Sequence, residues 1–254
     1  MANINDLALP ESLLHFYTTA PYPCSYLPDR QARSQVAVPP SQVDTTTYGM
    51  LVHRGFRRSG QFTYRPRCDG CQRCVPVRVR ALEFSPDRTQ RKIINRLNVP
   101  GLMQVSERPL IFDPEHYALY RDYQQSRHPQ GGMDDDDPDQ YREFLLNSGI
   151  DTRLVEFRID GKLVMVSMID VLNDGLSAVY TFFDPGTPKA SYGTYAILWQ
   201  IIQCQYNHLP YLYLGYWIGE STKMAYKARF QPMDMLDNDG WIKMSGLPAP
   251  SEPL

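Results

Sequence analysis

Residues 153–183 read RLVEFRIDGKLVMVSMIDVLNDGLSAVYTFF. Three runs rich in apolar residues, 153–159, 163–172 and 176–183, are separated by Asp160-Gly161 and by Asn173-Asp174-Gly175. Asp-Gly between two extended runs is typical of a tight hairpin, because both residues tolerate the positive φ angles that such turns require. The stretch therefore predicts three consecutive antiparallel strands.

Helical signals flank this meander on both sides. Asp113-Pro114-Glu115 combines an N-cap, a proline at the first helical position and an acid in the first turn, and predicts a helix to about Ser126. Residues 192–207 have helical apolar spacing, 211–218 resemble a strand, and 222–230 predict a short last helix. This order indicates an α+β fold. It matches the layout of GNAT-superfamily acyltransferases, in which a strand leads into a helix whose N-terminus faces the acyl donor.

The first hundred residues have a different character. They are rich in Pro, Gly and Arg, with short apolar alternations such as Val75–Val79, and predict short strands and loops. Thr89–Leu97 predicts a short basic helix, which Asn98-Val99-Pro100-Gly101 ends by turn chemistry. We therefore expect a smaller Cys- and Arg-rich domain over residues 1–100 and a GNAT-like domain over 101–254.

Charge is unevenly distributed along the chain. Residues 1–109 hold 15 Lys and Arg against 8 Asp and Glu, a net charge of +7, whereas the remainder holds 11 against 20, a net charge of −9. A basic first half favours contact with a polyanion, although a block of surface charge can also arise without any partner.

Nothing in the sequence indicates a membrane protein. There is no run of eighteen apolar residues, and residues 1–20 carry acidic and polar residues where a secretory signal would carry positive charge and a long apolar stretch. We therefore expect a cytoplasmic protein without a membrane partner.

Four of the five cysteines form the sharpest local feature. Cys68, Cys71 and Cys74 follow one another at two-residue spacing, and Cys24 is a candidate fourth ligand. In a cytosolic chain such thiols favour a zinc ion or an iron–sulfur cluster, although four reduced thiols packed in a small turn are an equal alternative. Cys204 lies on the apolar stripe of a predicted helix and is expected in the core.

Three segments resemble the arginyl-tRNA–protein transferase family, and in particular its bacterial leucyl branch. The first is Tyr22–Pro28 with Arg30-Gln31-Ala32-Arg33, and the second runs from Gly55–Gly60 through Tyr64-Arg65-Pro66 to Cys68–Cys74. The third joins Tyr180–Pro185 and Gly193-Thr194-Tyr195 to Leu214–Ile218 and Lys223–Lys227. Together they cover nearly the whole chain, in the order and spacing of the family.

The resemblance implies the reaction. An aminoacyl-tRNA is the donor and a protein N-terminus the acceptor, and in the bacterial branch leucine passes to N-terminal Asp or Glu as a degradation signal. An arginyl transferase with the same acceptors is one alternative, and a non-catalytic metal-ribbon RNA-binding protein is another. The segment Lys189–Tyr195 has one glycine where acetyl-CoA users have two, so we expect no CoA. The chemistry itself requires no cofactor, because the donor ester is already reactive.

The candidate site residues are cations, aromatic residues and one carboxylate. Arg54, Arg57 and Arg58 are interleaved with Phe56, Phe62 and Tyr64, which suits tRNA phosphates and bases, or one Arg grips the acceptor carboxylate. A solvated hairpin face is the alternative, and Arg30 and Arg33 have the same interpretations.

The remaining donor-binding candidates are Lys223 and Lys227, placed one helical turn apart, and Tyr192, Gly193 and Thr194. The catalytic candidates are Tyr226 as oxyanion donor, Asp184 as base or orienting group unless it only forms a turn, and Tyr216.

Overall fold

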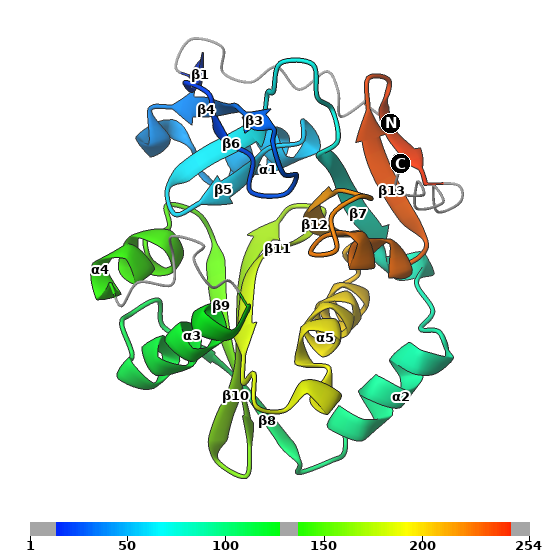
Figure 1. Ribbon diagram of the computed structural model, residues 1–254. Helices are drawn as coiled ribbons and strands as arrows, with labels where there is room; N and C mark the ends of the chain where they lie inside the picture. Colours follow the sequence, from blue (N-terminus) through cyan, green and yellow to red (C-terminus); the bar gives the residue numbers. More distant parts are fainter. Residues whose placement is uncertain (1–13, 128–136, 245–254) are drawn as a thin grey trace.

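The computed structural model describes residues 14–127 and 137–244 (Figure 1). Its centre is an eight-stranded sheet with the strand order β14-β13-β7-β12-β11-β10-β9-β8. The strands are β7 (Val75–Arg80), β8 (Met103–Arg108), β9 (Thr152–Ile159), β10 (Lys162–Leu172), β11 (Gly175–Phe183), β12 (Tyr211–Trp217), β13 (Met233–Asp237) and β14 (Gly240–Lys243). All neighbours are antiparallel except β11 and β12, which are parallel, so the chain has a mixed α/β fold built on one large sheet.

The predicted meander is confirmed as β9, β10 and β11. Asp160 and Gly161 turn the chain between β9 and β10 with φ angles of 49° and 79°, in the left-handed region that this tight turn requires. Successive side chains point to opposite faces, so Leu154 and Val155 enter different cores on the two sides of the sheet.

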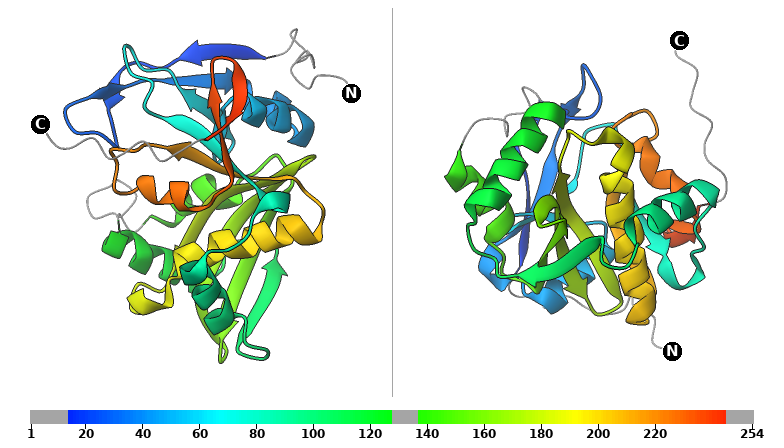
Figure 2. Two further views of the ribbon diagram at one scale, coloured as in Figure 1. Left: turned by 90° about the vertical axis from the view of Figure 1, so that its right-hand side faces the viewer. Right: turned by 90° about the horizontal axis from the view of Figure 1, so that it is seen from below.

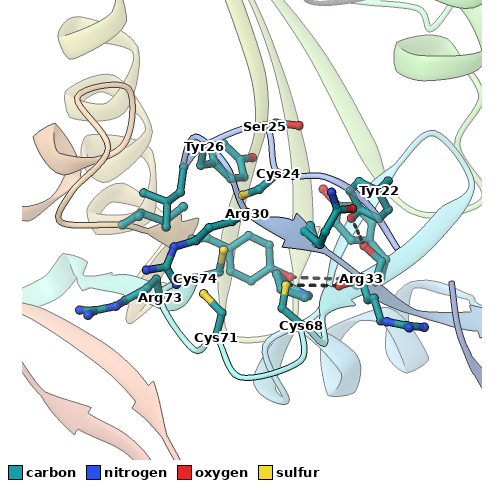
Figure 3. Close-up of a pocket in the computed structure, with 18 of the residues that line it drawn as sticks. Tyr22, Cys24, Ser25, Tyr26, Arg30, Arg33, Cys68, Cys71, Arg73 and Cys74 are labelled. Carbon is teal, nitrogen blue, oxygen red and sulfur yellow. Dashed lines mark hydrogen bonds between the residues drawn. The ribbon is translucent and has the colours of Figure 1, made fainter. Parts of the chain in front are cut away.

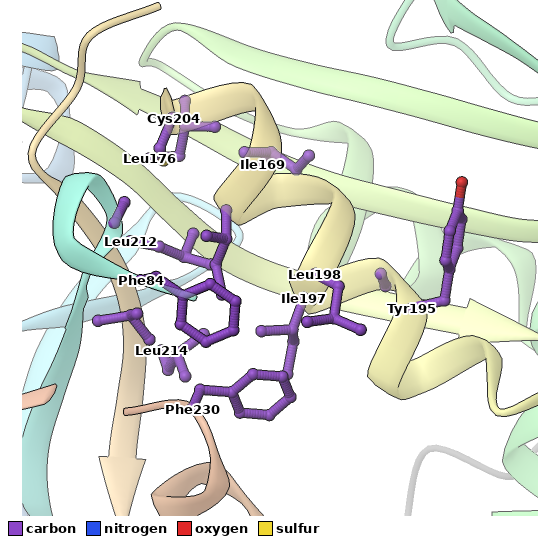
Figure 4. Close-up of a cluster of buried hydrophobic side chains, with 14 of the residues drawn as sticks. Phe84, Ile169, Leu176, Tyr195, Ile197, Leu198, Cys204, Leu212, Leu214 and Phe230 are labelled. Carbon is purple, nitrogen blue, oxygen red and sulfur yellow. The ribbon is translucent and has the colours of Figure 1, made fainter. Parts of the chain in front are cut away.

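Helices cover both faces of the sheet. The predicted helices appear as α2 (Arg88–Leu97), α3 (Pro114–Arg127) and α5 (Tyr192–Tyr206), and α4 (Pro138–Tyr141) continues into a π-helical turn at Arg142–Leu146. Viewed from below, α5 and α2 lie on one side of the strands and α3 and α4 on the other (Figure 2). Tyr195, Leu198 and Cys204 of α5 belong to the main core together with Leu212 and Leu214 of β12, and Figure 4 shows Cys204 beside Leu176 of β11. The prediction that Cys204 is a core residue is confirmed, since it is 0% exposed.

A smaller sheet made by the N-terminal part of the chain lies above the large one (Figure 1). Its order is β1-β4-β6-β5, and a further pair, β2 and β3, stands beside it. The bounds are β1 (His15–Thr18), β2 (Tyr22–Pro23), β3 (Gln31–Ala32), β4 (Ser34–Val38), β5 (Arg57–Ser59) and β6 (Phe62–Pro66). The sequence did not predict α1 (Thr45–His53), whose first turn is capped by Asp44 through the Thr47 amide.

Two sequence-based expectations need correction. The boundary expected near residue 100 does not separate the two sheets, because β7 pairs with β12 and β13 inside the large sheet and α2 packs on α5. The helix expected over 222–230 is only a 3₁₀ turn, η6 (Ala225–Arg229), which follows a series of turns.

No helix in the two described ranges has both the length and the apolar character needed to cross a bilayer. Residues 1–13, on which part of the argument against an export signal rested, lie outside the described residues.

Candidate active site

The parallel strands β11 and β12 pair over only three residues each. Gly175–Ser177 pair with Tyr211–Tyr213, and beyond that point both strands continue without a shared ladder. Helix α5, which connects the two strands, packs against both of them. The strands therefore diverge beside α5 and leave room for a ligand between them.

Arg57 of β5 lies where the two strands separate. Its Nη2 donates to the carbonyl oxygen of Ala178, the first β11 residue beyond the paired segment. Its guanidinium also packs against Gly215 of β12, where a Cβ atom would stand only 2.9 Å from Nη1. Gly215 has a φ of +73°, so this position needs glycine both for its backbone angle and for the space that Arg57 occupies.

A cavity of about 540 Å³, here called the central cavity, opens at this separation. Residues of β11, α5, β12 and η6 form its walls, together with Arg57 and Tyr64 from the smaller sheet. Its members include Tyr26, Arg57, Arg58, Tyr123, Ala178, Tyr180, Gln200, Leu214, Gly215, Tyr216, Lys223, Tyr226 and Lys227. None of the described residues that line it is Asp or Glu, so its ionised lining groups are all cationic.

A second cavity of about 510 Å³, the α5 cavity, lies at the N-terminus of α5. It shares Tyr123, Phe183, Gly193, Lys223 and Tyr226 with the central cavity, so the two cavities adjoin each other. Tyr192, Gly193 and Thr194 line it as the first residues of the helix, which brings this predicted group together with Lys223. Ser191, in the left-handed conformation, makes no side-chain cap, so its hydroxyl does not satisfy the first amides of α5.

Lys227, which the sequence suggested as a ligand of the donor's terminal phosphate or ribose, is a buried residue. Only 8% of it is exposed, and its Nζ donates to the carbonyl oxygen of Tyr216 at 2.6 Å. Burial, together with the charge of Arg57, lowers the pKa of Lys227 to about 7. Lys223 is exposed at the junction of the two cavities, so the two lysines do not share one helical face.

Asp184 and Tyr216 are both engaged in structural hydrogen bonds. Asp184 accepts from Lys162 Nζ at 2.6 Å and from the Gly186 amide at 2.8 Å, and the bond from Lys162 lowers the pKa of this carboxyl. It lines the α5 cavity rather than the central one, which favours its role in a turn. The Tyr216 hydroxyl donates to Gly55 O at 2.9 Å and thereby joins β12 to the N-terminal part of the chain.

Tyr226 is 39% exposed and lines both the central and the α5 cavities. Burial of its ring raises the pKa of its hydroxyl to about 12, so the group keeps its proton at neutral pH. A protonated hydroxyl can donate a hydrogen bond to a developing oxyanion, which is the role that the sequence suggested.

The four remaining arginine candidates lie in different environments. Arg58 is a structural residue, because it donates to both carboxylate oxygens of buried Asp170 at 2.7 and 2.8 Å and cannot reach tRNA phosphates. Arg33 pairs with exposed Asp69 at 2.9 Å. Arg30 lines the cysteine cavity described next, and Arg54 is exposed on the turn after α1.

The four clustered cysteines line one cavity of about 360 Å³, the cysteine cavity. Figure 3 shows Cys24, from the loop after β2, around the same space as Cys68, Cys71 and Cys74 from the segment between β6 and β7. Burial, followed by the neighbouring thiols of Cys68, Cys24 and Cys71, raises the pKa of Cys74 to about 12. The cavity shares Tyr26, Ser59, Tyr64 and Tyr216 with the central cavity.

As a donor set, four thiols around one space fit a thiophilic metal ion or an iron–sulfur cluster. In residues 14–127 and 137–244, however, no three Cys, His, Asp or Glu side chains stand in a ligating arrangement. The thiols would therefore have to draw closer together to hold a metal.

Sequence reasoning missed Gln200, which lies in α5 and is 1% exposed. Neither its amide nitrogen nor its amide oxygen has a hydrogen-bond partner among the described residues, although both atoms are buried. The available signal was a polar residue between Ile197 and Ile201 on an otherwise apolar helical stripe.

Comparison with known proteins identifies the family. The model described as "Arginine-tRNA-protein transferase, C terminus" matches residues 115–237, and its N-terminal counterpart matches residues 22–92. The aspartate/glutamate leucyltransferase of Chromobacterium violaceum is 56% identical over 231 residues, covering 91% of this chain and 94% of that protein. The enzyme of the same name from Nitrosospira multiformis is 56% identical over 247 residues, covering 97% and 96%.

Among solved structures, L-PGS from Bacillus licheniformis matches 66% of this chain and 49% of its own, with a TM-score of 0.43 and 11% identity. The sequence matches extend over most of the chain, in both its N-terminal and C-terminal parts. The chain therefore belongs to the arginine-tRNA-protein transferase family.

Proposed function

We propose that this protein transfers leucine from leucyl-tRNA to the N-terminal amine of proteins that begin with aspartate or glutamate, a step that marks them for degradation. Relatives that are 56% identical over nearly their whole length are named aspartate/glutamate leucyltransferase. The observation that carries the proposal is the cationic central cavity at the separation of β11 and β12, which adjoins the cavity at the uncapped N-terminus of α5. We also assign the β11–α5–β12 unit to a GNAT-type acyltransferase arrangement, and we place the protein in the cytosol, where charged tRNA is found.

The donor enters from the α5 cavity in this proposal. The unpaired amides at the start of α5 and the ammonium group of Lys223 favour the phosphate of the terminal nucleotide. Tyr192, Gly193 and Thr194 line this end, and a Cβ at Gly193 would lie 3.1 Å from the Phe183 ring. The aminoacyl ester then extends into the central cavity, beside Tyr226.

The reaction replaces the ester bond of the aminoacyl-tRNA by a peptide bond. The neutral acceptor amine attacks the ester carbonyl carbon, a C–N bond forms, and the C–O bond to the terminal ribose breaks. The amine gives up a proton, and the departing ribose oxygen takes one up. The hydroxyl of Tyr226 donates to the oxyanion of the tetrahedral intermediate, while the cavity walls hold amine and ester in contact.

Cavity charge favours leucine over arginine as the transferred residue. Arg57, Lys223 and Lys227 face the central cavity, and no described lining residue supplies a carboxylate. The guanidinium of an arginyl donor would be buried among like charges, which is costly without a counterion. The apolar side chain of leucine meets Ala178, Ile197 and Leu214 instead.

A transfer assay tests the function. Purified protein is incubated with an Asp-headed peptide and tRNA charged with radiolabelled leucine or, separately, arginine. Label passing from leucine to the peptide is the expected result. Transfer from arginine alone would identify an arginyl transferase, and binding of tRNA without any transfer would identify a non-catalytic RNA-binding protein.

We further propose that Cys24, Cys68, Cys71 and Cys74 hold a thiophilic metal ion or an iron–sulfur cluster that joins the loop after β2 to the segment between β6 and β7. Such a group would stabilise the wall that the cysteine cavity shares with the central cavity. Metal analysis of the purified protein tests this, with Cys71→Ala expected to lower the bound metal and Cys204→Ala, in the core, as control. Unchanged metal content in a folded Cys71→Ala protein would contradict the proposal.

A further inference from the structure

Two side chains that line the central cavity, those of Arg57 and Gln200, carry buried polar atoms without a hydrogen-bond partner among the described residues. Arg57 Nη1 is buried and has no hydrogen-bond partner among the described residues, although Nη2 donates to Ala178 O. Among the described residues the amide of Gln200 has no hydrogen-bond partner at either its nitrogen or its oxygen, and the residue is 1% exposed. Buried polar groups are normally paired, so two unpaired donors on side chains that line one cavity indicate a ligand that accepts from them.

Position separates these groups from the donor end. Arg57 and Gln200 line the central cavity and do not line the α5 cavity, where the terminal nucleotide is placed. Arg57 reaches its place from the smaller sheet, whose residues Ser59 and Tyr64 also line the cysteine cavity. The orphaned donors therefore lie outside the cavity in which the terminal nucleotide is placed.

Charge identifies the ligand. A leucyl ester has no anionic group for a guanidinium to bind, and its own ammonium would be repelled by one. Arg57 Nη1 and Gln200 Nε2 are both donors, and a carboxylate accepts from two donors at once. Arg58, the other guanidinium that lines the cavity, is already matched by Asp170.

We propose that Arg57 and Gln200 form the subsite that binds the side-chain carboxylate of the acceptor's N-terminal Asp or Glu. The inference rests on the proposed function for the identity of the acceptor. Lys227, which keeps Tyr216 O as its partner, lines the same cavity and adds a further N–H donor. Gln200 is thus a specificity residue, and the cost of leaving its Nε2 donor unpaired in the free enzyme is recovered when the acidic side chain accepts from it.

Peptide binding without tRNA tests the subsite directly. Affinities of otherwise identical peptides headed by Asp and by Asn are measured by calorimetry on the wild-type protein and on Gln200→Met and Arg57→Met. The wild type should prefer Asp by about tenfold or more, and each variant should lose most of that preference. Gln203→Met, on the same helix and outside the cavity lining, is the matched control and should behave as the wild type.

Stability distinguishes this role from a structural one. Because the Gln200 amide has no partner in the described ranges 14–127 and 137–244, Gln200→Met should unfold at the same temperature as the wild type or higher. A structural glutamine would instead lose stability when replaced. If Arg57→Met fails to fold, since Arg57 also holds Ala178 O, Gln200→Met decides the outcome alone.

The failures of the two proposals are distinguishable. Equal binding of Asp and Asn peptides to the wild type, or an unchanged preference in Gln200→Met, overturns the subsite. Variants that weaken leucyl-tRNA binding and leave the peptide preference intact overturn it too, and assign Arg57 and Gln200 to the donor. An Asp preference that disappears in the variants, in a protein that transfers no leucine, upholds the subsite and rejects only the proposed transfer reaction.

Discussion

At the scale of single residues, Gly215 leaves the space through which Arg57 reaches the central cavity. We expect Gly215→Ala to displace the guanidinium, since its Cβ would lie 2.9 Å from Nη1 and 3.0 Å from Cζ of Arg57. The Michaelis constant for Asp-headed peptides should rise at least about tenfold, and stability should fall by about 1–3 kcal/mol through the positive φ and the clash.

Gly161→Ala is the control for backbone strain. Gly161 has a φ of +79°, close to that of Gly215, and a Cβ there meets nothing within 4 Å. Gly161→Ala should lose stability because of the φ angle, without any change in the Michaelis constant for Asp-headed peptides. If both alanine variants leave the Michaelis constant for Asp-headed peptides unchanged, Arg57 does not depend on Gly215 for its position.

Tyr226 is the residue expected to act on the reaction itself. Tyr226→Phe removes only the hydroxyl, whose pKa is raised to about 12 by burial. The turnover number should fall about 10²–10³-fold, as when an oxyanion donor is lost elsewhere, with little change in leucyl-tRNA affinity. Single-turnover kinetics measure the step. Tyr206→Phe, at an exposed position at the end of α5, should have no effect, and an undiminished rate in Tyr226→Phe would transfer the role to another group.

At the scale of secondary-structure elements, Glu156 joins β9 to its neighbours. It is 5% exposed and accepts hydrogen bonds from Ser106 of β8 and His116 of α3, at 3.0 and 3.1 Å. Burial alone would raise the pKa of Glu156, but hydrogen bonds from Arg158, His116 and Ser106 outweigh it and lower the pKa to about 2. The ionised carboxylate thus stabilises the folded state.

This shift predicts how stability depends on pH. The contribution of Glu156 is complete above its ordinary pKa of 4.5 and disappears as the pH falls from 4.5 towards 2. Urea denaturation at pH 7 and pH 3 should therefore show a smaller acid-induced loss for Glu156→Gln than for the wild type. Glu83→Gln, in an exposed pair with Arg80, is the control, and identical pH profiles for all three proteins would contradict the assignment.

At the scale of the whole molecule, one buried ion pair connects the two sheets. Arg58 of β5 in the smaller sheet binds both oxygens of Asp170 in β10, and the two side chains are 3% and 0% exposed. Arg58→Met should cost about 3–5 kcal/mol of unfolding free energy, because it leaves the Asp170 carboxylate buried without its cation.

Arg153→Met provides the comparison on the surface. Arg153 pairs with Glu107 and Asp151, but its side chain is 45% exposed, so its loss should change stability by no more than about 1 kcal/mol. Urea denaturation measures both variants. Similar losses for the two would show that the sheets are held together mainly by apolar packing.

The uneven charge of the chain predicts salt-dependent binding of tRNA. Leucyl-tRNA affinity should fall steeply as salt rises, since each neutralised phosphate adds about 0.7–0.9 to the slope of log K against log salt. Lys223→Met should lower the magnitude of that slope by about 0.7–0.9, which is the contribution of one phosphate contact. Lys243→Met, on β14 and outside the three cavities, should leave it unchanged, and an equal slope in both variants would remove Lys223 from the donor site.

What the sequence determined by itself was the local structure. Asp-Gly turns, proline caps and apolar periodicity act over a few residues, so the meander and the helices α2, α3 and α5 followed from composition and spacing. The gathering of Cys68, Cys71 and Cys74 was equally local. Resemblance added the family, which the comparisons confirm.

Tertiary structure alone decided which polar groups line the central cavity. Arg57 and Arg58 are adjacent in the sequence, but successive strand residues point to opposite faces of a sheet. Arg58 therefore binds Asp170, 112 positions away, whereas Arg57 binds Ala178, 121 positions away. Burial of Lys227 and the orphaned amide of Gln200 depend in the same way on walls contributed by distant segments. Short-range patterns fix helices and strands, whereas the partner of a buried charge is set by long-range packing that no local window contains.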